Sequence, residues 1–171
     1  MSEARATRAR PARLGDAAAC ARIYNEGIED RVATFETEPR TRAEVARLLA
    51  ERASSHPAVV VERAGEVIAF AWTSAYRPRA CYAGIAEFSV YVAREARGVG
   101  AGRLALAAML EECERSGFWK LVSRVFPENA ASRRLCASLD FREVGVYRRH
   151  ARLDGRWRDV VIVERLLGEA R

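Results

Sequence analysis

Apolar residues recur along the chain at two spacings, one typical of helices and one typical of strands. Helical spacing over residues 17–28 predicts a first helix, with Asp16 in position to cap its N-terminus. Thr41 and Glu44 form a capping box that begins a second helix. Gly117 ends a long Ala- and Leu-rich helix. The last two expected helices cover residues 101–116 and 129–139.

Shorter runs rich in valine, isoleucine and aromatic residues predict strands, and Ala64-Gly65 marks a hairpin turn between two of them. The expected strands cover residues 7–13, 58–62, 66–76, 83–92, 119–125, 141–149 and 158–166. The order β-α-α-β-β-β-α-β-α-β-β is mixed α/β. Because the middle hairpin requires antiparallel pairing, the sheet cannot be doubly wound throughout.

The 171 residues suffice for one domain, which we place at residues 7–167. No apolar run is long enough to span a membrane, and residues 1–8 lack the apolar core of a secretory signal. The four scattered cysteines form neither a C-x-x-C pair nor a cluster with His56 and His150. We therefore expect a cytoplasmic protein with no membrane partner and no metal site.

A net charge of +6 and a pI near 9.6 raise the question of nucleic-acid binding. The arginines, however, are spread along the whole chain, and Lys120 is the only lysine. We interpret most of this charge as solvated surface, with a few arginines for an anionic ligand, and expect no nucleic-acid partner.

The most informative segment is a glycine-rich turn between an expected strand and the long helix. Gly98, Gly100 and Gly102 alternate with other residues directly after Arg97. Glycines let backbone N–H groups approach an anion, and the helix N-terminus adds the positive end of its dipole. The spacing fits neither the dinucleotide fingerprint nor the P-loop, so the segment predicts a pyrophosphate cradle of another kind.

This R-G-x-G-x-G segment resembles the acetyl-CoA loop of the GNAT N-acetyltransferases. The order of elements is also that of the GNAT fold, so the resemblance covers the whole expected domain. It implies that acetyl-CoA is the co-substrate. The residues it assigns to the pyrophosphate are Arg97, Gly98, Val99, Gly100, Ala101 and Gly102.

In the GNAT fold the strand before this loop splays from its neighbour and binds the pantetheine arm like an added strand. The resemblance gives this role to Phe88, Ser89 and Val90; the alternative is an ordinary half-buried strand. The segment from Asn129 through Ser132 to Phe141 resembles the family's second signature. The resemblance implies that Asn129 and Ser132 bind the cofactor; the alternative is that the Asn129 amide only caps a helix.

Two positions depart from that signature. Asp140 stands where glycine is usual at a helix C-terminus, a place that favours a left-handed residue. Cys136 stands where many GNAT enzymes have a tyrosine that protonates the departing thiolate. The cysteine either donates this proton or simply fills space, with solvent as the proton source, and the sequence leaves both alternatives open.

Glu87 is the candidate general base. Attack on a thioester requires a neutral amine, and a carboxylate beside the cleft can accept the excess proton. Strand alternation places Glu87 on the same face as Ser89 and opposite Phe88. The alternative is a solvated glutamate on a strand.

Three segments resemble the phosphinothricin and methionine-sulfoximine acetyltransferases, namely residues 32–41, 76–87 and 154–160. Residues 28–36 and 118–124 are most similar to the arsinothricin N-acetyltransferase branch. The resemblance implies acetylation of the α-amine of a glutamate-analogue amino acid, with resistance by detoxification as the outcome.

Such an acceptor carries anionic groups that arginine binds in bidentate fashion. The resemblance assigns this role first to Arg79 and then to Arg77, with Phe35 and Tyr82 as pocket walls. The alternative for both arginines is ordinary surface charge.

The resemblance also implies a homodimer, with Tyr147 and Trp157 as core or interface aromatics. Three other functions remain as alternatives. They are acetylation of protein N-termini or polyamines, acetyl-CoA binding without catalysis, and binding of nucleic acid.

Overall fold

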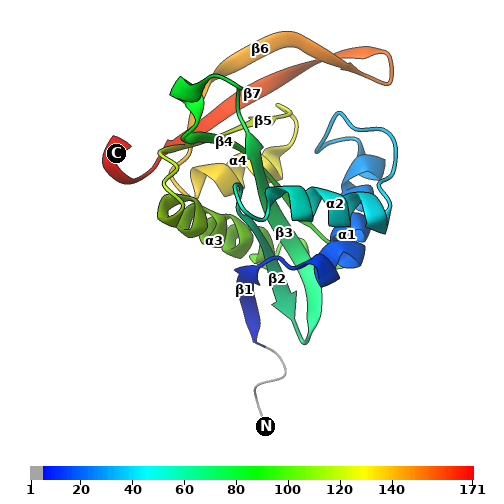
Figure 1. Cartoon of the computed structure of the whole chain (residues 1–171). Helices are drawn as coiled ribbons and strands as arrows, with labels where there is room; N and C mark the ends of the chain where they lie inside the picture. The colour runs from blue at the N-terminus through cyan, green and yellow to red at the C-terminus, as the bar shows by residue number, and fades with distance from the viewer. Residues whose placement is uncertain (1–5) are drawn as a thin grey trace.

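The computed structural model describes residues 6–171, so most of the N-terminal segment interpreted above lies outside the described residues. A seven-stranded sheet, in the order β1-β2-β3-β4-β5-β7-β6, is flanked by four helices (Figure 1). The expected mixed α/β architecture is thus confirmed. Among residues 6–171 no helix combines the length and apolarity that crossing a membrane requires.

The observed elements follow the expected order. The strands are β1 (Thr7–Pro11), β2 (Ala58–Arg63), β3 (Glu66–Ala75), β4 (Ile85–Val92), β5 (Lys120–Val125), β6 (Arg142–Leu153) and β7 (Arg156–Leu166). The helices are α1 (Ala17–Asp30), α2 (Arg42–Arg52), α3 (Ala101–Arg115) and α4 (Ala130–Ala137).

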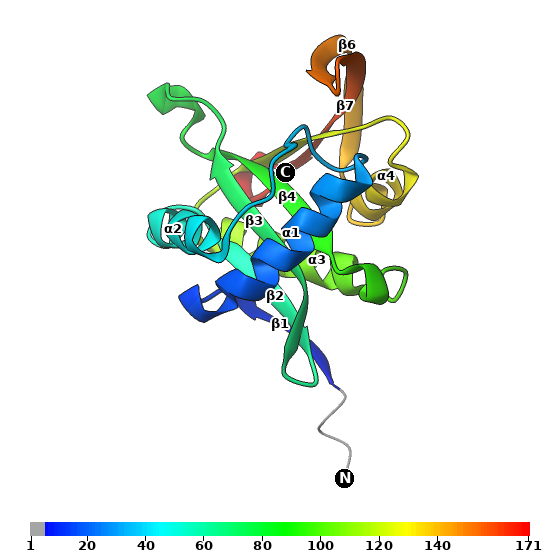
Figure 2. The same cartoon turned by 90° about the vertical axis from the view of Figure 1, so that its right-hand side faces the viewer.

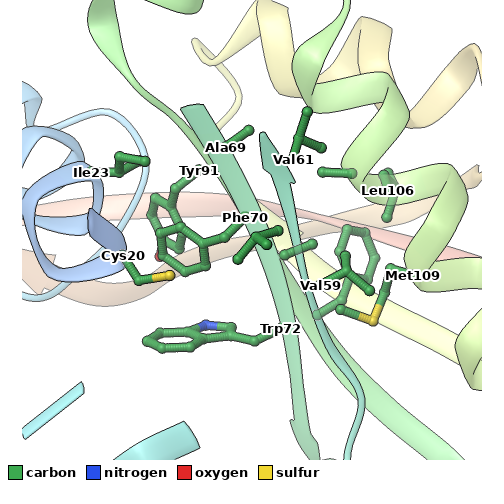
Figure 3. Packing of buried hydrophobic residues seen from close by; sticks show 14 of the residues in the cluster. Cys20, Ile23, Val59, Val61, Ala69, Phe70, Trp72, Tyr91, Leu106 and Met109 are labelled. Carbon is green, nitrogen blue, oxygen red and sulfur yellow. The ribbon is translucent and has the colours of Figure 1, made fainter. Parts of the chain in front are cut away.

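Apolar side chains cover both faces of the sheet. Helices α1 and α2 lie on one face and α3 on the other (Figure 2). Cys20 and Ile23 of α1 pack near Trp72 and Tyr91 on the first face (Figure 3). On the second face, the side chains of α3 pack against β1 to β4. This double burial makes the sheet a rigid base for the loops at its ends.

One parallel pair interrupts an otherwise antiparallel sheet. Strands β4 and β5 pair only from Ile85 opposite Lys120 to Glu87 opposite Val122. Beyond that point they diverge, and the Ser123 hydroxyl donates to the Phe88 carbonyl oxygen at 2.9 Å. The sheet therefore contains an open seam, here called the β4–β5 seam, directly before the glycine-rich loop.

Helix ends illustrate how local chemistry decides the boundaries. The Thr41 hydroxyl accepts from the Glu44 N–H while the Glu44 carboxylate accepts from the Thr41 N–H, which confirms the capping box. Asp16 directly precedes α1, but the expected side-chain cap is wrong. Asp16 is itself the last residue of a 3₁₀ turn (Leu14–Asp16), and its carboxylate accepts from the Arg13 N–H at the start of that turn and from the Arg10 guanidinium.

The β6–β7 hairpin is longer than expected. Strand β6 runs to Leu153 and β7 begins at Arg156, so the expected break over residues 150–157 is wrong. Asp154 and Gly155 form the turn with φ of 49° and 74°, and two left-handed residues suit the twist of a two-residue hairpin. Sequence reasoning assigned Asp154-Gly155 to a family motif and missed this turn signal.

Candidate functional site

The glycine-rich loop is shaped by three glycines with different roles. Gly98 and Gly100 have φ of 79° and 89°, in the left-handed region where residues with a Cβ are strained. Gly102 allows close packing, because a Cβ there would lie 3.2 Å from a Val92 methyl group and 3.4 Å from one of Leu135. Gly100 is the N-cap of α3 and has no side chain to cover the first-turn N–H groups.

A cavity of about 490 Å³ opens above this loop, between α1, β4 and α4. It brings together predicted cofactor residues from three separate segments. They are Val90, Arg97, Gly98, Gly100, Ala101, Gly102, Asn129 and Ser132. Val99 is exposed and does not line it.

A smaller hollow of about 50 Å³ continues along the β4–β5 seam. It shares Val90, Asn129 and Ser132 with the larger cavity, and Phe88 and Ser89 line it. The two spaces together form a path from the loop N–H groups to the seam. A long ligand with an anionic end and a hydrogen-bonding arm fits this arrangement.

Arg97 is held by a carboxylate in this structure. One guanidinium nitrogen lies 2.7 Å from Asp30 Oδ2, and Arg97 Nε donates to the Val92 carbonyl oxygen at 3.3 Å. Burial opposes ionisation of Asp30, but hydrogen bonds from Arg94 and Arg97 outweigh it and lower the pKa of that carboxyl. Arg97 and its carboxylate partner Asp30 therefore both line the larger cavity.

Asn129 has two hydrogen-bonding roles. Its Oδ1 accepts from the Ser132 N–H at 3.1 Å, which confirms the predicted cap of α4. Its Nδ2 donates to the Val32 carbonyl oxygen at 3.0 Å, which fastens the α1–α2 loop to α4. The predicted tolerance of Asp140 for a left-handed conformation also holds, since its φ is 59°.

Cys136 lies at the inner wall of the smaller hollow and is 3% exposed. Burial, reinforced by the charge of Glu143, raises the pKa of its thiol to about 11. An ordinary alkyl thiol has a pKa near 8.5. Protonation of a departing thiolate by Cys136 is therefore uphill.

Glu87 occupies the last position of β4 that pairs with β5, and it forms an ion pair with the guanidinium of Arg124 on β5. Arg124 follows Val122, the register partner of Glu87, by two residues, so both side chains lie on one face of the sheet. Sequence reasoning missed this contact because it depends on the β4–β5 register. From the sequence, strand alternation predicts only that Arg124 and Val122 lie on the same face of the sheet. It does not predict that Arg124 lies beside Glu87.

The predicted acceptor residues are dispersed over two connections. Phe35, in the α1–α2 loop, packs edge to face on Phe126 with ring centroids 4.8 Å apart. Arg79 and Tyr82 lie on the β3–β4 connection, which reaches beyond the ends of both strands (Figure 2). Arg77, on the same connection, lies over the ring of Tyr76.

The residues on the β3–β4 connection line neither cavity. Arg124 does line the smaller hollow, beside the predicted base.

Among residues 6–171, no group of three or more histidine, cysteine or acidic side chains is placed to hold a metal ion.

Comparison with known proteins agrees with this geometry. Residues 20–141 match the Acetyltransferase (GNAT) family. The chain is 34% identical to a phosphinothricin N-acetyltransferase of Alcaligenes faecalis, covering 92% of this chain and 81% of that protein. It is 30% identical to an L-methionine sulfoximine/L-methionine sulfone acetyltransferase of Pseudomonas paraeruginosa, covering 91% of each.

Its structure is similar to that of a GNAT phosphinothricin acetyltransferase from Sinorhizobium meliloti solved with acetyl-CoA. The TM-score is 0.87 at 32% identity, covering 95% of this chain and 89% of that one. The chain therefore belongs to the GNAT family and is an N-acetyltransferase whose co-substrate is acetyl-CoA.

Proposed function

We propose that the protein acetylates the α-amine of a glutamate-analogue amino acid, namely arsinothricin, phosphinothricin or methionine sulfoximine, and so detoxifies it. The observation that carries this proposal is the Glu87–Arg124 pair at the point where the seam opens, with Arg124 lining the smaller hollow. It places a proton acceptor and an anion binder together. The names of the relatives and the three acceptor-type segments support the same class of acceptor.

The loop N–H groups from Gly98 to Gly102 would hold the pyrophosphate, and the backbone of Phe88 to Val90 would hold the pantetheine arm. Bound in this way, acetyl-CoA supplies an activated acetyl thioester at the end of the seam. Arg97 would leave Asp30 or share it in order to contact a phosphate.

Glu87 would accept the proton that the α-ammonium group must lose before it attacks. The nitrogen then bonds to the acetyl carbon as the carbon–sulfur bond breaks. One further proton leaves the nitrogen and one joins the thiolate. The overall change converts an ammonium and acetyl-CoA into an amide, free CoA thiol and one released proton.

Cys136 would serve as packing rather than as the acid. Its thiol is almost fully buried and has a pKa of about 11, which supports solvent as the source of the last proton. Acetylation of the α-amine would remove its positive charge. The product would no longer resemble glutamate at its amino-acid end.

An acetyl-CoA consumption assay across arsinothricin, phosphinothricin, methionine sulfoximine and glutamate tests the proposal. We expect turnover of at least one of the three analogues to exceed turnover of glutamate and of spermidine. Turnover confined to spermidine or to an N-terminal peptide would replace the proposal with one of the alternatives. Binding of acetyl-CoA without turnover of any amine would indicate a non-catalytic module.

We also propose a homodimer formed along β6. This edge strand is exposed almost throughout, and it carries Val144, Val146 and Tyr147, which are 47%, 52% and 54% exposed. Trp157 on β7 is 52% exposed. An exposed apolar edge of this length is expected to be covered. Sedimentation should show a dimer for the wild type and a monomer for Val146→Lys. A monomeric wild type would contradict the proposal.

A further inference from the structure

We propose that a zwitterionic acceptor displaces the Glu87–Arg124 ion pair when it binds. Arg124 exchanges the Glu87 carboxylate for the α-carboxylate of the incoming amino acid, and Glu87 is thereby released to face the α-ammonium group. This inference rests on the proposed function, since it concerns how the same site selects its acceptor. It makes Arg124 a specificity-determining residue.

The position of the pair favours an exchange. Glu87 and Arg124 flank the point where β4 and β5 separate, so no further backbone pairing closes the space beyond them. Their side chains are 28% and 45% exposed, so an acceptor reaches them from solvent. Half-exposed ion pairs contribute little to stability, and the pair therefore opens at little cost.

The charges of the pair match those of an amino acid. An α-amino acid carries an ammonium and a carboxylate on the same carbon, and the pair offers one carboxylate and one guanidinium on the same face of the sheet. A guanidinium binds a carboxylate through two parallel hydrogen bonds, which also fixes orientation. Each charge that is separated when the pair opens thus gains a new partner.

The location of Arg124 distinguishes it from the other candidate arginines. Arg77 lies over Tyr76, and Arg79 is on the same exposed connection, away from both cavities. Arg124 lines the seam hollow together with Ser89 and Cys136. It is therefore placed where the acetyl group must arrive, and the connection residues are left for the far end of the acceptor.

The exchange has a consequence for selectivity. An amine without an α-carboxylate leaves Arg124 paired with Glu87, so the base remains occupied. A polyamine or a peptide N-terminus is then a poor acceptor even where it fits sterically. Bond making and breaking are unchanged: the nitrogen–acetyl bond forms, the carbon–sulfur bond breaks, and Glu87 receives the first proton.

The test compares methionine sulfoximine with its α-carboxamide, which lacks the carboxylate charge, in the wild type and in Arg124→Gln. We expect the wild type to favour the free acid by on the order of 10- to 100-fold in kcat/KM, as for a charge-assisted contact. In Arg124→Gln the ratio falls toward one, chiefly through a higher KM for the free acid. Arg124→Lys, which keeps the charge but not the bidentate geometry, restores part of the ratio.

Arg115→Gln is the matched control, because Arg115 forms a half-exposed pair with Glu112 at the far end of α3. It should keep the wild-type ratio, and all variants should bind acetyl-CoA equally by calorimetry. An unchanged ratio in Arg124→Gln, or an equal loss for both acceptors, would overturn the inference while leaving the proposed function intact. A wild type that turns over none of the glutamate analogues would overturn both.

Discussion

The carboxylate of Asp30 lies 2.7 Å from the guanidinium of Arg97, which ties the last residue of α1 to the first residue of the glycine-rich loop. Asp30 thus occupies the arginine that a pyrophosphate would use and places a negative charge beside it. We expect Asp30→Asn to strengthen acetyl-CoA binding by roughly 3- to 10-fold at low salt. Calorimetry at two salt concentrations measures this, and weaker binding would show instead that Asp30 positions Arg97.

Replacement of Glu87 tests its role as the base. We expect Glu87→Gln to lower kcat by on the order of 10²- to 10⁴-fold, because an amide cannot accept the proton of an ammonium. The Kd for acetyl-CoA should stay unchanged. Glu66→Gln, at the exposed start of β3, is the control. A kcat that stays at the wild-type value over a range of pH would rule out this assignment.

Removal of the Cys136 thiol separates packing from acid catalysis. A buried thiol with a pKa of about 11 is a poor acid, so we expect Cys136→Ala to keep kcat within about twofold. Because the side chain is buried, the variant should lose roughly 1 kcal/mol of unfolding free energy. Steady-state kinetics and urea unfolding give the two numbers, and a drop in kcat of more than tenfold would point to proton donation.

The left-handed glycines make a prediction about backbone rather than side chains. Gly100→Ala places a Cβ at a φ of 89°, which costs about 1–2 kcal/mol. We expect a lower melting temperature and weaker acetyl-CoA binding, because the loop would relax away from its present path. Gly15→Ala, which has open space around its Cβ, serves as control. Equal melting temperatures for the two variants would contradict this account of the loop.

Asp16 predicts how stability depends on pH. The hydrogen bonds from Arg10 lower the pKa of its carboxyl, so the ionised form stabilises the folded chain. This contribution is present above the unfolded pKa, near 3.9, and is lost as the pH falls through the lower folded value. We expect Asp16→Asn to cost about 2 kcal/mol at pH 7 and less below pH 4.

Urea unfolding of the wild type and Asp16→Asn from pH 7 to pH 3 measures that difference. Glu38→Gln, in the exposed α1–α2 loop, should follow the wild type across the range. If the difference in unfolding free energy between the wild type and Asp16→Asn stays constant down to pH 3, the Asp16 carboxyl does not titrate as its contacts indicate.

Local signals predicted most of the fold. The Thr41 capping box begins α2 and Asn129 caps α4, because each depends only on residues three positions apart. Asp16 shows the limit of such reasoning. Its position beside α1 was right, but Arg10 of β1 donates two hydrogen bonds to its carboxylate. Tertiary contacts thus redirected a side chain that the sequence assigned to a cap.

The candidate site was predicted less completely, for a topological reason. The loop glycines lie close together in sequence, so their spacing alone predicted a special turn before α3. Arg124 and Glu87 are 37 positions apart and meet only through the single parallel register of the sheet. The hydrogen bond from Asn129 to the Val32 carbonyl spans 97 positions and involves backbone, which no side-chain pattern encodes.

The β4–β5 seam also bears on how this protein avoids strand pairing with other protein chains. Backbone groups left without a strand partner normally attract the edge of another chain. Here the gap begins inside the sheet, with β3 on one side and β7 on the other, so a foreign strand has no lateral approach. A slender molecule can enter lengthwise where a folded neighbour cannot. An interior opening thus offers hydrogen bonds to a small guest without serving as a template for aggregation.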